Sequence, residues 1–323
     1  ATVLPDGSLV IDLYYTRNQY TVTVNKGTGI SSVTGGGTYY YGASVTVDAT
    51  VSTGYTWKNW TGSSSSTDQQ YTFTMGAADV TLTANATVNS YTVTVNPNGG
   101  TWGGQTSNST FTATYGETKE VANPTRTGYT FAGWTVSGGG SLSGTTYTQG
   151  DGDCTLTAKW TANAVNYTVR HWKMNLSGSG YTEDTASRQT LAANADSTVT
   201  LANLKKSFTG FTYKEGKVGD TVKTTATVLP DGSLVIDLYY TRNQYTVTVN
   251  KGTGISSVTG GGTYYYGASV TVNATVSTGY TWKNWTGSST STNQQYTFTM
   301  GAANVTLTAN ATVNSYTLTV NPN

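Results

Sequence analysis

The sequence predicts an all-β protein made of tandem small sheet modules, and three observations support this fold class. Residues 226–323 repeat residues 1–98 with only five differences, as expected of a repeat array. Charged residues make up 10% of the chain, whereas about 25% is usual, and the chain holds 24 tyrosines and 38 glycines. Short stretches that alternate apolar and polar residues are bounded by Gly, Pro and Asn, which is typical of strands separated by turns.

The differences between the two copies are chemically mild. The paired positions that differ are Asp48/Asn273, Ser65/Thr290, Asp68/Asn293, Asp79/Asn304 and Val93/Leu318. Three of the five replace a carboxylate by an amide of the same shape. An amide cannot act as a general acid or base and is a poor ligand for hard metal ions, so these aspartates are not expected to hold an active site.

Residues 1–17 are expected to be the end of a module whose whole copy lies later in the chain. Pro5–Ser8 is a turn signal, with Pro presetting φ and Gly supplying a positive φ. From Leu9 to Tyr15 the apolar residues recur at period two, which predicts a strand. The chain opens and closes inside repeated sequence, so we expect it to be a segment of a longer array.

Residues 18–88 are the first module that the sequence contains in full. Short alternating stretches lie at 20–25, 45–49, 71–75 and 80–84. They predict four or more short strands. A sheet of this size has a thin core, which suits packing against a neighbouring module.

Residues 89–161 repeat the plan with different residues and carry a recognisable motif. The motif consists of Pro124, Gly128-Tyr129, Phe131 and Gly133-Trp134, followed by alternating Leu156, Ala158 and Trp160. It resembles the InlB B-repeat, also called the Listeria-Bacteroides repeat, over nearly the whole module.

Two further resemblances cover most of the remaining chain. Residues 18–88 resemble a divergent form of the same repeat through Gly54-Tyr55, Trp57, Trp60 and the closing Val80-Thr81-Leu82. Residues 162–242 are similar to the MucBP (mucin-binding protein) class of repeat. The residues that carry this similarity are Tyr167–Trp172, Leu229–Gly232 and the alternating Ile236, Leu238 and Tyr240.

The expected domain organisation follows from these resemblances and the duplication. It consists of 1–17 (end of a MucBP-like module), 18–88 (divergent InlB B-repeat-like), 89–161 (InlB B-repeat-like), 162–242 (MucBP-like), 243–313 (copy of 18–88) and 314–323 (start of the next InlB B-repeat-like module). The resemblances imply a β-grasp-like sheet in each module and an elongated array. They also imply an extracellular, cell-wall-attached location on a Gram-positive bacterium.

Composition excludes several function classes. The net charge of +1 gives no basic surface for nucleic acid. No apolar run approaches the ~18 residues of a membrane span, so no membrane insertion is expected in this segment. The single cysteine, Cys154, alternates with Leu156 and Ala158 and is expected to be a small buried hydrophobe. No catalytic residue, metal site or cofactor is predicted, and the chain is not expected to be an enzyme.

The aromatic residues offer the only candidate ligand sites. Most of the Gly-Tyr-x-Phe/Trp-x-x-Trp residues are expected to build the cores of modules that have few aliphatic residues. Trp102 directly follows the Gly99-Gly100 turn, and Trp172 is out of phase with Tyr167 and Val169. Both are therefore expected to be exposed and are the ligand-binding candidates. His171, the only histidine, is expected to be a polar strand residue. Asp151–Asp153 has the oxygens of a calcium site but is expected to be a simple turn.

The sequence favours a structural function. We expect a stalk of tandem β modules in a bacterial surface protein or adhesin, with neighbouring repeat modules as the main partners. Two alternatives stay open. One is an array that binds host glycan or mucin weakly at many sites. The other is lateral self-association of the repeats into a surface filament.

Overall fold

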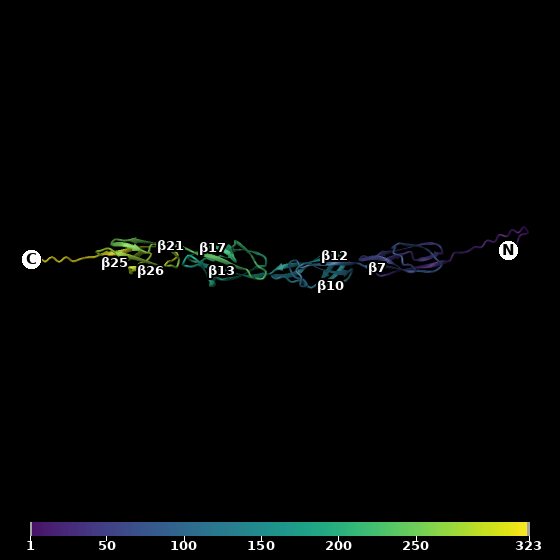
Figure 1. Cartoon of the computed structure of the whole chain (residues 1–323), viewed down its shortest axis with the longest axis horizontal. Helices are drawn as coiled ribbons and strands as arrows, with labels where there is room; N and C mark the ends of the chain where they lie inside the picture. Colours follow the sequence, from purple (N-terminus) through teal and green to yellow (C-terminus); the bar gives the residue numbers. More distant parts are fainter. Residues whose placement is uncertain (1, 322–323) are drawn as a thin grey trace. The chain divides into compact units, whose positions relative to one another are not determined.

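The computed structural model describes residues 2–321, and the regular structure of these residues is β-strand apart from two short 3₁₀ helices (Figure 1). The helices are η1 (Thr185–Ser187) and η2 (Leu201–Leu204). Within this range no helix is long and apolar enough to span a membrane. The all-β fold class predicted from the alternating pattern is therefore confirmed, with several small sheets along the chain.

Internal contacts divide the chain into two compact units. The first contains residues up to Arg126 together with Thr130–Thr161, and the second contains Thr127–Tyr129 together with the residues from Ala162 onward. Each unit contains two groups of strands, and each group has its own hydrophobic core.

The first group of the first unit consists of two small sheets. Its strands are β1 (Gln19–Lys26), β2 (Ile30–Thr34), β3 (Gly37–Tyr40), β4 (Ser44–Val51), β5 (Tyr55–Gly62), β6 (Tyr71–Thr74) and β7 (Val80–Val88). One sheet has the order β3-β1-β7-β5 and the other the order β2-β4-β6. Strands β1 and β7 are parallel neighbours, so the chain between them must cross over, and part of the crossover forms the second sheet.

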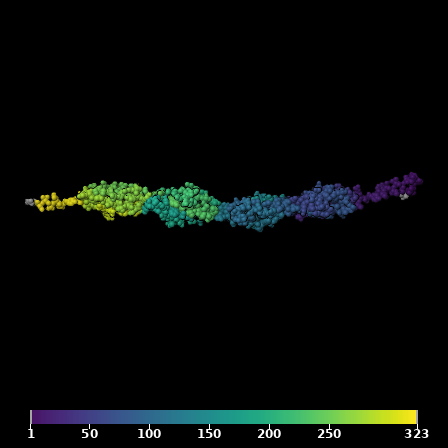
Figure 2. Space-filling view, viewed as in Figure 1, coloured from purple at the N-terminus to yellow at the C-terminus, as the bar shows by residue number. Residues whose placement is uncertain are grey.

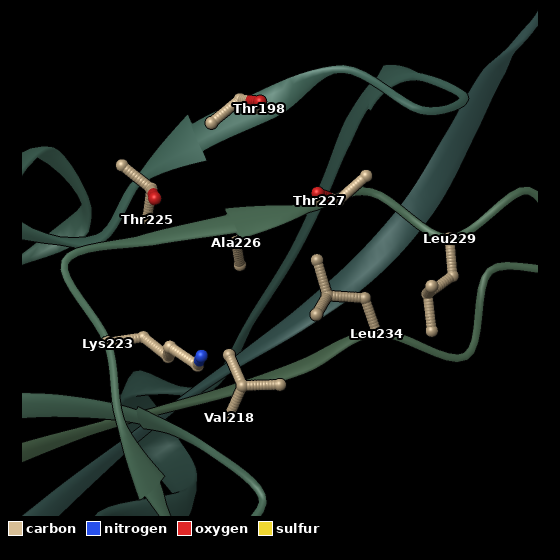
Figure 3. Close-up of a pocket in the computed structure, with 8 residues that line it drawn as sticks. All are labelled: Thr198, Val218, Lys223, Thr225, Ala226, Thr227, Leu229 and Leu234. Atoms are coloured by element: carbon tan, nitrogen blue, oxygen red, sulfur yellow. The ribbon is translucent and has the colours of Figure 1, made fainter.

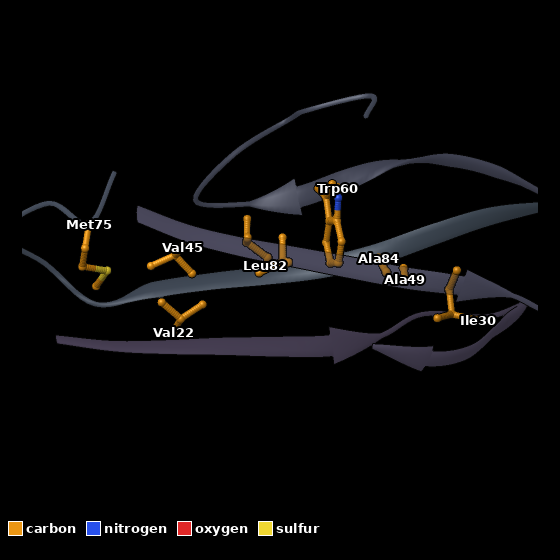
Figure 4. Close-up of a cluster of buried hydrophobic side chains, with 9 residues drawn as sticks. Val22, Ile30, Val45, Ala49, Trp60, Met75, Leu82 and Ala84 are labelled. Carbon is orange, nitrogen blue, oxygen red and sulfur yellow. The ribbon is translucent and has the colours of Figure 1, made fainter. Parts of the chain in front are cut away.

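Apolar side chains of both sheets meet in one core (Figure 4). Val22 and Leu82 come from the central parallel pair, Val45 from β4 and Trp60 from β5. Because successive side chains of a strand point to opposite faces, the period-two pattern places every second residue in this core. The fully buried Trp60 indole N–H donates to the backbone oxygen of Asp68 at 3.0 Å.

The second group of the first unit is one sheet with the order β10-β12-β8-β9, in which β11 also pairs with β12. Its strands are β8 (Ser90–Asn96), β9 (Ser109–Thr114), β10 (Thr118–Glu120), β11 (Tyr129–Ser143) and β12 (Thr146–Ala162). The parallel pair β8 and β12 again lies at the centre and buries Val93, Val95 and Leu156. Cys154 lies in the same core, 2% exposed, as its alternation predicts.

The first group of the second unit has the sheet order β14-β13-β20-β17-β18, with β15 also paired to β13. Its strands are β13 (Ala164–Met174), β14 (Tyr181–Glu183), β15 (Gln189–Asn194), β16 (Thr198–Thr200), β17 (Phe211–Val218), β18 (Thr221–Val222), β19 (Thr225–Thr227) and β20 (Val235–Arg242). Strands β16 and β19 form a separate two-stranded sheet. The core collects Leu234, Ile236, Leu238 and Tyr240 from one face of the β20 segment, as the sequence pattern predicts.

The last group repeats the first, as the duplicated sequence requires. Its strands are β21 (Gln244–Lys251), β22 (Ile255–Thr259), β23 (Gly262–Tyr265), β24 (Ser269–Val276), β25 (Tyr280–Gly287), β26 (Gln295–Thr299) and β27 (Val305–Val313). The sheet orders β23-β21-β27-β25 and β22-β24-β26 match those of the first group.

The structure corrects the prediction of a strand near the beginning of the chain. Residues 2–17 are exposed and form no strand, although 226–242 has the same sequence and contains β20. Strand β20 lies between β13 and β17, which supply its hydrogen-bond partners and help to cover its apolar face. Residues 2–17 have no such neighbours among the described residues, and Figure 2 shows them in purple outside the packed domain.

A similar contrast holds for residues 314–321. They form no strand, although Ser90–Asn96, with nearly the same sequence, is β8. The strands β9 and β12 flank β8 in the complete module, and 314–321 have no equivalents of them among the described residues. Ala1, Pro322 and Asn323 lie outside the described residues.

Candidate functional site

Aromatic and charged residues of β13, β14 and β20 form a connected polar surface in the second unit. We call Arg170, Trp172, Tyr181, Asp237 and Tyr239 the aromatic–ionic face. The Trp172 and Tyr239 rings are stacked, with centroids 6.1 Å apart and planes 13° apart. The Tyr181 ring meets Tyr239 edge-on at 5.0 Å. The parallel register of β13 and β20 pairs Trp172 directly with Tyr239, which explains the stack.

Asp237 is the centre of this face, although it is only 6% exposed. Its carboxylate accepts two hydrogen bonds from the Arg170 guanidinium and one from the Trp172 indole N–H, at 2.6, 2.7 and 2.7 Å. The hydrogen bonds to Asp237 raise the pKa of Arg170 above its usual value. Burial raises the pKa of the Tyr239 hydroxyl, so both groups keep their neutral-pH ionisation states.

Cations surround the rings of the aromatic–ionic face. The Lys217 ammonium lies 5.0 Å from the Tyr239 ring centroid, and the Arg170 guanidinium carbon lies 5.3 Å from that of Trp172. The Lys214 ammonium lies 5.9 Å from the Tyr181 ring. Flat rings beside charged donors can stack on an apolar sugar face and donate hydrogen bonds to its hydroxyl groups.

The two predicted ligand-binding residues are half-buried rather than exposed. Trp172 belongs to the aromatic–ionic face, where Asp237 and Tyr239 hold its ring. Trp102 packs against the core of the β8–β12 group, and its indole N–H donates to the Ala122 carbonyl at 2.9 Å. Trp102 belongs to the first unit and Trp172 to the second.

A second polar cluster lies inside the β13–β20 group and is centred on His171. This histidine is fully buried, whereas the sequence predicts only a polar strand residue. Its Nδ1 lies 3.0 Å from the Tyr240 hydroxyl and its Nε2 lies 3.1 Å from Gln189 Oε1. Burial lowers the pKa of His171 below its ordinary value of 6.5. The cluster satisfies buried polar atoms and therefore stabilises the core.

A groove of about 380 Å³ lies between the β16–β19 sheet and the strands beneath it (Figure 3). The side chains of Val218, Ala226 and Leu234 supply its apolar walls, and Lys223 lies at one side. Threonines 198, 225 and 227 complete the lining, together with Leu229. The groove has one charged side chain and no pair of groups suited to acid–base chemistry.

The remaining residues considered from the sequence contribute to a core or to the pairing of strands. Trp57 and Trp60 meet edge-on at 5.4 Å, which confirms that the Gly-Tyr-x-Trp-x-x-Trp stretch contributes to the core. The prediction of a turn at Asp151–Asp153 is wrong, because these residues lie within β12. Tyr91 donates a short hydrogen bond to Asp151, and Asp153 accepts the backbone N–H of Thr92, so both carboxylates bind β8. Across residues 2–321 no group of three or more His, Cys, Asp or Glu residues could hold a metal ion.

Two of the three exchanged carboxylates, Asp48 and Asp79, bond through an oxygen that an amide also carries. Asp79 Oδ1 accepts the Thr21 N–H at 2.7 Å, and Asn304 Oδ1 accepts the Thr246 N–H at 2.9 Å. Asp48 and Asn273 each accept the N–H of the residue that follows them. This equivalence explains why the two copies tolerate Asp and Asn at the same positions.

Consecutive modules within each unit are joined by hydrogen bonds that the sequence pattern did not predict. In the first unit, the Asn89 N–H donates to the Gly54 carbonyl at 2.8 Å, and the Asn89 carbonyl accepts the Tyr115 N–H at 2.9 Å. The Thr56 hydroxyl donates to Asn89 Oδ1 at 2.6 Å. The Tyr115 ring covers Gly54 so closely that an added Cβ would lie 2.1 Å from its Cγ. One linker residue thus continues the hydrogen bonding of β5 and of β9.

The second unit contains an equivalent joint. The Asn243 N–H donates to the Gly210 carbonyl and the Asn243 carbonyl accepts the Tyr266 N–H, both at 2.9 Å. The Thr212 hydroxyl donates to Asn243 Oδ1 at 2.7 Å. The Tyr266 ring covers Gly210, and its carbonyl accepts a hydrogen bond from Arg242 at 2.8 Å. The signal that could have revealed both joints is Gly-aromatic-Thr in one module and Asn in the linker.

Comparisons with known proteins agree with this architecture. Residues 20–90 and 245–315 match the family model of the divergent InlB B-repeat domain. Residues 91–159 match the model of the Listeria-Bacteroides repeat domain. No curated protein matches the chain. A solved structure, the Bacillus anthracis TIE protein, is similar at 8% identity with a TM-score of 0.27, over 91% of this chain and 51% of that chain.

The family matches confirm two of the three resemblances seen in the sequence. Both families occur in bacterial surface proteins and are typical of non-enzymatic ones. The chain spans about half the length of the solved structure that it matches. The chain is thus an array of tandem repeat domains of bacterial surface-protein families, with two divergent InlB B-repeat domains and one Listeria-Bacteroides repeat domain.

Proposed function

We propose that the chain is part of a stalk that holds a distal domain of a surface protein or adhesin away from the cell wall of a Gram-positive bacterium. The proposal includes the domain boundaries 18–88, 89–161, 162–242 and 243–313, with a MucBP-like module at 162–242. The neighbouring modules are then the main partners of each module. The family matches on three of these four modules support an extracellular location.

The observation that carries this proposal is the hydrogen bonding of the linker asparagines. Asn89 and Asn243 each bond to a glycine of the preceding module and to a tyrosine of the following one. A linker whose backbone groups are bonded on both sides has little freedom to bend, since bending would expose these groups without partners. Restricted joints suit a protein whose task is to keep a distance.

The low charge of the modules also suits a stalk. Charged residues are 10% of the chain, and the exposed strand positions are largely threonine, serine and asparagine. Because salt screens interactions between exposed charges, a surface with few charges changes little with ionic strength. The dimensions of the stalk would then stay constant across environments.

Small-angle X-ray scattering of this chain over a concentration series tests the proposal. A module of this size contributes roughly 30–40 Å, so four modules end to end would give a maximum dimension near ~140 Å. A compact particle nearer ~50 Å would overturn the stalk. A mass that rises with concentration would instead favour lateral self-association into a filament.

The aromatic–ionic face favours a second candidate function, weak and multivalent binding of host glycan or mucin. The stacked Trp172 and Tyr239 rings, flanked by Lys217, have the chemistry of a sugar-binding surface. Titration of the chain with mucin-type glycans tests this function. Saturable binding that Trp172→Ala abolishes and Trp102→Ala leaves unchanged would support it. Absence of saturable binding in the unaltered chain would exclude it for the glycans tested.

A further inference from the structure

A sequence of Gly, then Tyr or Phe, then Thr occurs five times in the chain. One occurrence, Gly180-Tyr181-Thr182, lies inside a module at β14, and the other four each precede an asparagine in the following linker. These four are Gly54-Tyr55-Thr56, Gly128-Tyr129-Thr130, Gly210-Phe211-Thr212 and Gly279-Tyr280-Thr281, and the asparagines are Asn89, Asn163, Asn243 and Asn314. Each of these four glycines has a positive φ, between 75° and 87°. The recurring geometry at the ends of modules indicates one design for joining them.

The side chain that covers the glycine differs between occurrences, whereas the backbone pattern is constant. Within the second unit, the Asn163 N–H donates to the Gly128 carbonyl at 2.9 Å, and the Asn163 carbonyl accepts the Ala195 N–H at 2.9 Å. Here Pro230 lies against the glycine in place of a tyrosine ring. Tyrosine is thus the covering residue in the two joints that lead into InlB-type repeats.

Gly279 has every part of such a joint except the covering side chain. Its carbonyl accepts the Asn314 N–H at 2.8 Å, and the Thr281 hydroxyl donates to Asn314 Oδ1 at 2.6 Å. The equivalent distances at Gly54 are the same. No atom of the described residues lies within 4 Å of the position of an added Cβ on Gly279, whereas a tyrosine ring fills that position on Gly54.

We propose that Gly279 and Asn314 form a docking socket for a further repeat module, which places a tyrosine ring over Gly279 as Tyr115 does over Gly54. The socket combines the open face of Gly279, the backbone carbonyl of Asn314 and the neighbouring Tyr280 ring. The carbonyl accepts the tyrosine N–H, and the ring packs on Cα of the glycine. At Gly54 the residue equivalent to Tyr280 is Tyr55, which meets Tyr115 edge-on at 6.2 Å.

The register of the first strand identifies which module fits the socket. Ser90 of β8 pairs with Thr114 of β9, so Asn89 and Tyr115 are the next pair along the ladder. Residues 315–321 repeat the sequence of 90–96 with one change, Leu318 for Val93. They can therefore form the first strand of a module like 89–161. In that module the tyrosine equivalent to Tyr115 would pair with Asn314, as Tyr115 pairs with Asn89, and would lie over Gly279.

Nuclear magnetic resonance of Gly279 tests the socket. In an extended chain, residues 99–161 are added after Asn323, which completes a module equivalent to 89–161. A glycine Hα beneath an aromatic ring shifts upfield. We expect the Gly279 Hα signal to move upfield in the extended chain, toward the position that Gly54 and Gly210 have in both chains. Replacing the added copy of Tyr115 by Ala should restore the signal of the unextended chain.

The matched control is Tyr41→Ala in the extended chain. Tyr41 is the sequence copy of Tyr266, and its N–H donates to Asn18 at 2.9 Å, but its side chain is 53% exposed. This change should leave the Gly279 signal in place. An unshifted Gly279 in a folded extended chain would overturn the proposal. A Gly279 shift that grows with the concentration of the unextended chain would assign the socket to a second copy, and would overturn the proposed occupant.

A second measurement uses the unextended chain and does not depend on the added module. Gly54→Ala and Gly279→Ala meet the same backbone strain, since the φ angles are +81° and +87°. Only Gly54→Ala also clashes with a ring, so it should lower the unfolding midpoint further. If both variants lowered the unfolding midpoint equally, the contact of the Tyr115 ring with Gly54 would contribute nothing to stability. The proposed socket at Gly279 would then have no basis. The inference rests on the proposed stalk. The two proposals can fail separately, because the maximum dimension of the unextended chain in scattering does not depend on whether a further module docks on Gly279.

Discussion

The Asp237 carboxylate holds the Arg170 guanidinium through two hydrogen bonds, from Nε at 2.6 Å and from Nη2 at 2.7 Å. The two residues are directly opposite each other on the parallel strands β13 and β20. The Trp172 indole donates to the same carboxylate, so one buried acid orders an arginine and an aromatic ring. This ion pair therefore holds the side chains of the aromatic–ionic face in place.

The duplicated sequence supplies an internal control for this pair. Asp12 is the copy of Asp237 but lies in the exposed segment 2–17. We expect Asp237→Ala to destabilise its module by about 2–3 kcal/mol, because it leaves the Arg170 and Trp172 donors without their acceptor. The value is below that for a fully buried pair because the Arg170 side chain is 33% exposed. Asp12→Ala should change nothing. If Asp237→Ala and Asp12→Ala changed the free energy of denaturant unfolding equally, the stabilising role of Asp237 would be contradicted.

The buried His171 predicts a pH dependence of stability. Its pKa is below 6.5 in the folded state because of burial, and Lys206 lowers it further. Below about pH 6.5 the unfolded chain binds a proton that the folded chain does not, so stability is present above this pH and is lost as pH falls. The slope should be at most about 1.4 kcal/mol per pH unit.

The measurement is denaturant unfolding of the chain between pH 7.5 and 5, with the imidazole signals followed by nuclear magnetic resonance. His171 is the only histidine, so the signals need no separation from others. The first unit contains no histidine and serves as the control, because its unfolding should stay constant over this range. A folded-state titration midpoint above 6.5 would contradict the prediction.

The Asp/Asn equivalence predicts a pair of mutations with different outcomes. Asp79→Asn should leave the free energy of unfolding unchanged within about 0.5 kcal/mol, because the amide oxygen accepts the Thr21 N–H as Asn304 accepts that of Thr246. Asp79→Ala removes the acceptor and should cost about 1 kcal/mol. Thermal unfolding of both variants checks the prediction, and a large loss in Asp79→Asn would show a role for the negative charge.

Limited proteolysis separates the two copies of one sequence. Tyr14 and Tyr15 are 93% and 86% exposed in a segment without strands. Their copies Tyr239 and Tyr240 lie in β20, and Tyr240 is 1% exposed. Brief chymotrypsin treatment should therefore cut after Tyr14 or Tyr15 and spare β20, as read by mass spectrometry. Cleavage at both places at equal rates would mean that β20 opens readily.

The outcomes for individual residues show where sequence reasoning reached its limit. Alternation at period two correctly placed Leu82, Leu156 and Cys154 in cores, since in a strand the face of a residue follows from its position. His171 lies in a strand as expected, but its full burial was not predicted, because polar residues enter a core when other segments bring partners such as Gln189 and Tyr240. The expectation that Trp102 would be exposed rested on its place after a glycine turn and was wrong, because its indole donates to a carbonyl 20 residues away along the chain.

The aromatic–ionic face was found only in part. Trp172 was identified from its phase in the strand, but no sequence pattern indicated that Asp237 and Tyr239, over 60 residues later, would join it. Their meeting depends on the parallel pairing of β13 with β20. Parallel partners are separated by a long crossover, so no local spacing in the sequence predicts their register.

The sequence by itself determined that the protein is a duplicated array of small β modules, because strand periodicity and turn residues act locally and repeat with the sequence. Only the tertiary structure decided which copy of a sequence folds. The segment 226–242 forms β20 between β13 and β17, whereas 2–17 stays exposed. The physical reason is that a strand has no partners for its backbone groups or its apolar face until neighbouring strands provide them.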